Sequence, residues 1–190
     1  MAAVHATPSR EDLATALLGR VGEDLGQICD QDVVLALRLV EEQAERAAGA
    51  DKVHISFRLR FRDQRVPGAP IDRWGTLLLP LAEAVSLACY LLMVPDEAVA
   101  THRRSVNLDE TTKDAVMEVG NFVGGGVDAC LRSLFDGDVT ARFGGCQGVR
   151  AGVRPAMPYE EGEPLVVVRG EGRIGDFPAF PFLMLLPPLV

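Results

Sequence analysis

Residues 109–135, DETTKDAVMEVGNFVGGGVDACLRSLF, are the stretch of this 190-residue sequence that decides the fold. At 100° per residue its apolar side chains point within about 40° of one direction, which predicts a long helix with one buried face. The apolar positions are Val116, Val119, Val123, Val127, Cys130 and Leu134. The opposite, polar face carries Asp114, Glu118, Asn121, Gly125, Asp128 and Arg132. The helix is therefore expected to cover a core and to offer a polar stripe to solvent.

The polar stripe differs from a plain solvated helix face, which is the alternative interpretation. Asparagine is a poor residue in the middle of a helix, because its amide competes for backbone groups, yet Asn121 occupies such a position. Glycines crowd the same helix at Gly120, Gly124, Gly125 and Gly126, and each costs up to about 1 kcal/mol relative to alanine. Three of them lie off the stripe, which indicates close internal packing. Gly125 lies on the stripe beside Asn121, where a missing side chain leaves room for a partner.

The segments around this helix predict an α+β fold. We expect further helices over 9–28 and 81–93, and strands over 33–40 (with a helix through Glu45 as the alternative), 53–62, 74–79, 139–143, 149–153, 165–169 and 180–186. Residues 53–62 alternate apolar and mostly basic side chains, which predicts a strand with one buried and one basic face. Because no regular βαβ alternation is present, we predict a mainly antiparallel sheet packed against long helices. We assign residues 1–190 to one domain, with 1–8 as a flexible N-terminus.

Composition narrows the range of partners. Asp and Glu number 27 against 19 Lys and Arg, which gives a formal net charge of −8. This sign argues against nucleic acid or an anionic membrane as the main partner, although a local basic patch could face an acidic protein. The most apolar run, residues 77–94, contains Pro80 and Glu83, so we predict no membrane insertion. The N-terminus lacks a secretory signal pattern, and we expect a cytoplasmic protein.

Familiar chemical motifs are not supported by their context. The four cysteines and three histidines are scattered without metal-ligand spacing, so we predict that this chain alone builds no metal site. Cys29, Cys89 and Cys130 are expected to be buried small hydrophobic residues. Residues 170–175 spell GxGxxG, but Pro178 and Pro181 forbid the helix that a dinucleotide site needs. We therefore predict a β-turn between two strands there.

The polar stripe resembles a known signature. Asp114-x3-Glu118-x2-Asn121, followed by Gly125, resembles the signature helix of the CheC/CheX/FliY family of chemotaxis phosphatases, and the resemblance extends over about residues 74–134. The sequence holds one copy of the motif, because the N-terminal helix has Glu23-Asp24-Leu25-Gly26 where a second asparagine would be needed. The single-site, CheX-like branch is therefore the more similar one. Two positions depart from the family pattern: Gly126 replaces an asparagine, and Phe143 and Gly144 stand where a proline is expected.

The resemblance implies a phosphatase of two-component signalling that dephosphorylates a CheY-like response regulator. Such a regulator supplies a phosphorylated aspartate, a lysine and Mg²⁺, so no cofactor bound by this chain alone is expected. An asparagine amide both donates and accepts, so Asn121 would orient the attacking water, and Glu118 would pair with the regulator's lysine. Asp114, Gly125 and Asp128 would contact the partner.

Two alternatives remain open. The first is a non-catalytic adaptor or dimerisation module in a chemotaxis or motility system. The second, weaker one is a small-molecule sensor that uses the apolar region 89–93. Exposed strand edges and the apolar C-terminus lead us to expect a homodimer.

Overall fold

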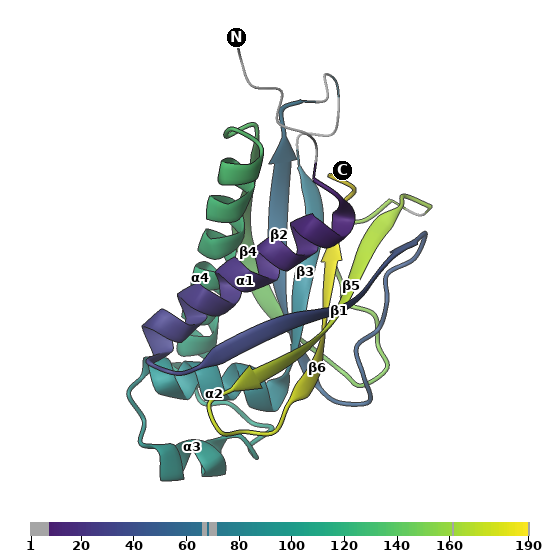
Figure 1. Ribbon diagram of the computed structural model, residues 1–190. Coiled ribbons are helices and arrows are strands. Elements are labelled where there is room, and N and C mark those ends of the chain that lie inside the picture. The colour runs from purple at the N-terminus through teal and green to yellow at the C-terminus, as the bar shows by residue number, and fades with distance from the viewer. Residues whose placement is uncertain (1–7, 66–67, 69–71, 161, 190) are drawn as a thin grey trace.

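The computed structural model describes residues 8–65, 68, 72–160 and 162–189. The flexible N-terminus predicted at 1–8 thus lies, except for Pro8, outside the described residues. The described chain forms four helices and six strands (Figure 1). In chain order they are α1 (Arg10–Cys29), β1 (Val33–Gln43), β2 (His54–Asp63), β3 (Arg73–Pro80), α2 (Leu81–Leu91), α3 (Asp96–His102), α4 (Glu110–Leu134), β4 (Val139–Val149), β5 (Leu165–Ile174) and β6 (Phe180–Leu186).

The six strands form one antiparallel sheet in the order β1-β5-β6-β3-β2-β4. This arrangement confirms the predicted α+β class with a mainly antiparallel sheet. The C-terminal strand β6 lies inside the sheet, between β5 and β3, whereas β1 and β4 form its two edges. The structure therefore brings the last strand of the sequence into the middle of the core (Figure 1).

Helices α1, α2 and α4 pack on one face of the sheet, and the apolar core lies between the two layers (Figure 1). The apolar side chains of β2, Phe57, Leu59 and Phe61, are buried on this helical side. Apolar side chains on the opposite face form a second, smaller cluster, in which Ala47 and Met157 pack with Leu78 and Leu185. Residues that precede β2 and β5 thus cover part of the outer face.

The two long helices begin at side-chain caps. The Ser9 hydroxyl accepts the backbone N–H of Asp12 at 3.1 Å, and this fixes the start of α1. The Asp109 carboxylate accepts the backbone N–H of Thr112 at 2.8 Å and fixes the start of α4. The cap at Asp109 sets where the polar stripe of α4 begins.

Two local predictions are wrong. The strand expected over 149–153 is absent, because β4 already ends at Val149 and a turn follows over residues 151–152. Residues 170–174 belong to β5 and form no β-turn; the turn lies just after them, where Gly175 has φ of 51°. Gly170 and Gly172 lie under the rings of Phe182 and Phe180 on β6, which leave no space for a side chain. These glycines therefore serve strand packing, and no helix follows them.

The helix expected over 81–93 is shorter than predicted and a second helix was missed. Helix α2 ends at Leu91, and Met93 adopts the left-handed conformation with φ of 56°. Helix α3 then forms after Pro95; proline suits a helix start because the backbone N–H that it lacks has no partner within the helix there. Apolar periodicity could not reveal α3, since Val99 is its single buried residue.

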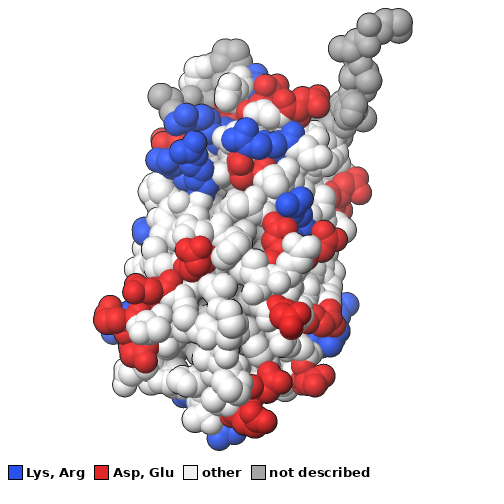
Figure 2. Space-filling view, turned by 90° about the vertical axis from the view of Figure 1, so that its left-hand side faces the viewer, with Lys and Arg blue, Asp and Glu red and all other residues white. Residues whose placement is uncertain are grey.

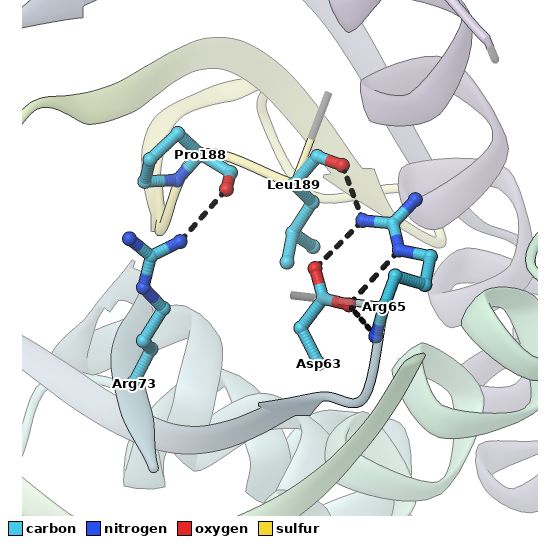
Figure 3. Close-up of polar contacts among 5 residues, drawn as sticks. All are labelled: Asp63, Arg65, Arg73, Pro188 and Leu189. Carbon is cyan, nitrogen blue, oxygen red and sulfur yellow. Dashed lines mark hydrogen bonds and ion pairs between the residues drawn. The ribbon is translucent and has the colours of Figure 1, made fainter. Parts of the chain in front are cut away.

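The apolar C-terminal tail packs within its own chain. Nη2 of Arg65 donates to the carbonyl oxygen of Leu189 at 2.6 Å, and Nη1 of Arg73 donates to that of Pro188 at 3.0 Å (Figure 3). Arg65 is itself held by the Asp63 carboxylate at 2.7 Å. The described part of the tail is thus not a free surface for dimerisation, and the predicted homodimer now depends on the edges of β1 and β4.

Candidate functional site

The site is carried by α4, whose buried stripe agrees with the sequence pattern. Val116, Val119, Val123 and Val127 are each at most 2 % exposed, and they face the sheet and the neighbouring helices. Helix α4 packs on β4 and against α1 and α2. This burial fixes the rotation of the helix, so the residues on its far side are held toward solvent.

A notch of two glycines lets α4 approach β4 closely. Phe143 of β4 lies against both Gly120 and Gly124: a Cβ at Gly124 would stand 2.7 Å from the Phe143 backbone nitrogen, and a Cβ at Gly120 would overlap the Phe143 ring. Phe143 occupies the position where the resemblance expects a proline. Here this residue fills the notch and determines how closely the candidate helix packs on the sheet.

The second departure from the family pattern also has a packing cause. Gly126 is buried where α4 packs on α1, and a Cβ there would lie 2.8 Å from a carboxylate oxygen of Asp24 and 3.4 Å from Cα of Val21. A side chain at this position would require the Asp24 carboxylate to move. The predicted internal packing role of Gly120, Gly124 and Gly126 is confirmed.

Glu118 and Asn121 form an exposed pair on the free side of α4. Nδ2 of Asn121 donates to Oε2 of Glu118 at 2.8 Å, across one helical turn. Both residues are exposed. The bond orients the Asn121 amide, and Oδ1 of Asn121 accepts no hydrogen bond from any described residue. The pair thus presents a carbonyl acceptor, a second amide hydrogen and a carboxylate to whatever approaches this face.

The three residues predicted to contact a partner differ in their surroundings. Asp114 is exposed one turn before Glu118. Gly125 is exposed one turn after Asn121, and a Cβ there would meet nothing within 4 Å, so the space predicted beside Asn121 is open. Asp128 is only half-exposed, and its carboxylate is already engaged within the chain. Its Oδ1 accepts the backbone N–H of Ala141 at 2.9 Å and its Oδ2 accepts Nε of Arg132 at 2.7 Å.

Asp128 therefore has a structural role that the sequence pattern did not reveal. Its bond to Ala141 joins α4 to the start of β4, close to Phe143 in the same strand. A hydrogen bond between a helix side chain and a distant strand leaves no periodic signal in the sequence, so its partner could not be predicted. A contact of Asp128 with a bound protein stays a prediction.

An apolar groove of about 630 Å³ runs beside the candidate helix, and sequence reasoning missed it. It is lined by residues of β2, α2, α4 and β4 and of the segments before β2 and α4, among them Val53, Val106, Met117 and Cys146. Val106 is 73 % exposed and Met117 is 40 % exposed, so an unusual amount of apolar surface is accessible next to the polar pair. Met117 lies one turn before Asn121 on α4, so the groove adjoins the polar pair.

The cysteines agree with their prediction. Cys29, Cys89 and Cys130 are buried, and burial raises the pKa of the Cys29 thiol to about 12. Cys146 is partly exposed at the groove, with its sulfur 3.1 Å from that of Met117. Across the described ranges, no three side chains of His, Cys, Asp or Glu are grouped to hold a metal ion. No helix among the described residues is long and apolar enough to cross a membrane.

Comparisons with known proteins place this fold among solved structures. No family model matches the chain, and no curated protein matches it. The structure is similar to Thermotoga maritima FliY, with a TM-score of 0.71 and 15% identity over 94% of this chain and 87% of that chain. It is similar to a chain in the FliG–FliM complex from H. pylori (TM-score 0.63, 11% identity, 93% and 90% covered). It is also similar to the chemotaxis protein CheX from Desulfovibrio desulfuricans (TM-score 0.55, 14% identity, 91% and 96% covered).

These likenesses span nearly the whole chain at low sequence identity. At 11–15% identity they concern the fold and not the chemistry of particular side chains. The chain has the fold shared by FliY, the FliM middle domain and CheX-like chemotaxis proteins.

Proposed function

We propose that this protein is a phosphatase that accelerates dephosphorylation of a CheY-like response regulator. The observation that carries the proposal is the exposed, hydrogen-bonded pair of Glu118 and Asn121 on the free side of α4. The likeness to FliY and CheX supports a role in chemotaxis signalling, because it places the motif helix in a fold that those proteins share.

Asn121 would orient the attacking water, which is the one requirement of the reaction that the regulator itself does not meet. Hydrolysis of an aspartyl phosphate needs a water in line with the scissile P–O bond and compensation of the charge on the phosphoryl oxygens. The regulator's own lysine and Mg²⁺ would provide the charge compensation. Oδ1 of Asn121 would accept a hydrogen bond from the water while the oxygen of the water attacks phosphorus. The P–O bond to the aspartate then breaks, the aspartate leaves as carboxylate, and the water proton passes to the medium or to the released phosphate.

Glu118 would act in two ways. Its Oε2 holds the Asn121 amide through the 2.8 Å bond, and this directs Oδ1 outward. The same carboxylate would pair with the regulator's lysine and fix the register of α4 in the regulator's site. The open space at Gly125 lets the regulator come close to the helix backbone, and Asp114 extends the contact by one turn.

The neighbouring groove would receive an apolar part of the same regulator. Polar pairs on a rim add little binding energy, whereas buried apolar anchors carry most of it. Met117 and Val106 offer such anchors beside Glu118. The proposal therefore assigns chemistry to the polar pair and most of the affinity to the groove.

A phosphate-release assay tests the proposal. Phosphorylated regulators of the source organism are incubated with the parent protein, with Asn121→Ala and with Ser133→Ala, a control at another exposed position of α4. We expect Asn121→Ala to remove most of the acceleration, by about 100-fold, since oriented catalytic groups contribute on this scale. Binding should change little, and Ser133→Ala should behave as the parent. A parent protein without acceleration on any regulator, or Asn121→Ala at the parent rate, would contradict the proposal.

The second candidate is a non-catalytic adaptor of a chemotaxis or motility assembly. The specific observation in its favour is the likeness to FliM middle domains, one of them in a complex with FliG. An adaptor of this kind would bind its partner with equal affinity in the parent and in Asn121→Ala, and neither would change the lifetime of the regulator's phosphate. The same assay, combined with a binding titration, separates the two functions.

A further inference from the structure

The outer face of β2 carries an unusual concentration of arginine. Phe57, Leu59 and Phe61 face the helices, so the alternating residues Arg58, Arg60 and Arg62 project from the opposite side of the sheet. Figure 2 shows lysine and arginine side chains gathered at the upper end of the molecule. In a chain with a net charge of −8, such a local concentration of positive charge needs a cause.

The register of the sheet adds a fourth arginine to this face. Arg142 of β4 lies directly opposite Arg60 of β2. Like charges at directly opposed positions of an antiparallel pair repel each other and destabilise the sheet. No ion pair joins Arg142 to a carboxylate in the part of the chain that the structure describes. The fold alone therefore does not explain why two arginines face each other here.

One carboxylate lies among these arginines without neutralising them. Asp72 is 3.9 Å from Nη1 of Arg60 and 3.6 Å from Nη2 of Arg62, distances too long for hydrogen bonds. Its Oδ1 is buried without a hydrogen-bond partner among the described residues. Three guanidinium groups and one carboxylate leave a formal charge of about +2 around this point, and the arginine donors remain free to bind an anion.

These residues enclose a small hollow. Its volume is about 90 Å³, and it is lined by Arg60, Arg62, Asp72, Thr140 and Arg142. Sites for nucleotide-sized ligands measure some hundreds of Å³, so this hollow suits a single compact ion. Guanidinium groups match the oxygen geometry of phosphate and bind it through paired hydrogen bonds, and the Thr140 hydroxyl can donate one more.

We propose that Arg60, Arg62 and Arg142, with Thr140, form a binding site for one phosphate-type dianion, either free phosphate or the phosphoryl group of a monoester. A dianion balances the charge of about +2 and removes the repulsion between Arg60 and Arg142. The site is independent of the proposed phosphatase function, because its side chains project from the face of the sheet opposite to α4.

Titration of the ¹⁵N-labelled protein with sodium phosphate, glycerol phosphate and sodium chloride at matched ionic strength tests this site. We expect phosphate to shift backbone amide signals of 58–62 and 140–142 in a saturable way, with tighter binding at pH 8 than at pH 5.5, where the dianion is scarce. Arg60→Gln and Arg142→Gln should each weaken binding at least 10-fold. Arg38→Gln serves as the control, because Arg38 is 61 % exposed and pairs with Glu171 at the other edge of the sheet.

The variant Asp72→Asn distinguishes an anion-binding site from a cluster of charges that only stabilises the fold. Removal of the competing negative charge should tighten phosphate binding several-fold, whereas loss of a structural ion pair would leave affinity unchanged or lower it. Shifts with glycerol phosphate assign the site to a phosphoryl group on a larger molecule, and shifts with phosphate alone assign it to the free ion. The proposal is overturned if chloride produces the same shifts, if Arg38→Gln weakens binding as much as Arg60→Gln, or if Asp72→Asn does not tighten it.

Discussion

Nδ2 of Asn121 donates a 2.8 Å hydrogen bond to Oε2 of Glu118, one turn earlier on the exposed side of α4. The bond makes the two side chains one unit, in which the carboxylate fixes the direction of the amide. Glu118 therefore contributes both a hydrogen bond that orients the Asn121 amide and a negative charge. Substitutions at Glu118 can separate these two contributions.

Glu118→Gln should raise the regulator concentration needed for half-maximal rate by about 10-fold while most of the maximal rate remains. The glutamine carbonyl still accepts from Asn121, but the charge that would pair with the regulator's lysine is lost, and a charge-assisted bond is worth about 1.5–3 kcal/mol. Glu118→Ala removes both effects and should lower the maximal rate as well. Phosphate release measured against regulator concentration separates the two. Identical behaviour of Gln and Ala variants would argue against an orienting role of the hydrogen bond.

Gly124→Ala should destabilise the protein by about 1–3 kcal/mol, the usual cost of overpacking a core contact. The added methyl group would stand 2.7 Å from the backbone nitrogen of Phe143, and backbone cannot move aside as a side chain can. Gly125→Ala is the matched control on the next residue of the same helix. It meets nothing within 4 Å and should stabilise the protein by up to about 1 kcal/mol. Urea unfolding measures both changes, and equal effects of the two substitutions would refute the notch at Phe143.

Gly125→Leu should leave the fold intact and weaken regulator binding by at least 10-fold. The leucine side chain would project from the polar stripe into the space beside Asn121, where the regulator is proposed to approach. A binding titration with the phosphorylated regulator measures the effect, and Thr111→Leu, at another exposed position of α4, is the control for added apolar surface. Parent-like affinity of Gly125→Leu would place the docking surface elsewhere.

Strong periodicity explains which parts of this fold could be predicted from the sequence. The helix over 109–135 and the strand over 53–62 match α4 and β2 within one residue at each end, because long apolar stripes and strict alternation leave few other solutions. The strand order could not be predicted, since β6 pairs with β3 across about a hundred residues of sequence. The turn predicted at the GxGxxG segment is wrong because Gly170 and Gly172 accommodate rings of the neighbouring strand, a cause that lies outside the local sequence.

The candidate site shows the same division. Spacing alone placed Glu118, Asn121 and Gly125 on one exposed face, because i,i+3 and i,i+4 neighbours on a helix must share a face. The hydrogen bond that Asp128 accepts from the backbone N–H of Ala141 could not be predicted, because only the tertiary fold brings β4 next to α4. The groove at Met117 combines residues of four elements and of the segments before β2 and α4, so no single segment could indicate it.

The ion pair between Asp63 and Arg65 should make stability depend on pH in the acid range. Hydrogen bonds from the Arg65 side chain and backbone hold the pKa of the Asp63 carboxyl below its ordinary value of 3.8. The ionised carboxylate is thus favoured in the folded state, so its contribution is present above about pH 4 and is lost as the pH falls through the lower, folded-state pKa. The same Arg65 donates to the carbonyl of Leu189 (Figure 3), so the loss should loosen the tail as well. Its guanidinium carbon also lies 4.3 Å from the centre of the Phe135 ring.

Asp63→Asn tests this dependence, because it keeps the shape of the side chain and removes its charge. We expect a loss of about 1.5–3 kcal/mol at pH 7, as for hydrogen bonds to a charged group, and a difference from the parent that shrinks steadily below pH 4. Glu110→Gln breaks the exposed pair with Lys113, which solvent screens, and should change stability far less than Asp63→Asn does at pH 7. Urea unfolding at several pH values between 3 and 7 measures both variants. A deficit of Asp63→Asn that stays constant down to pH 3 would show that the carboxylate charge does not hold this corner of the fold together.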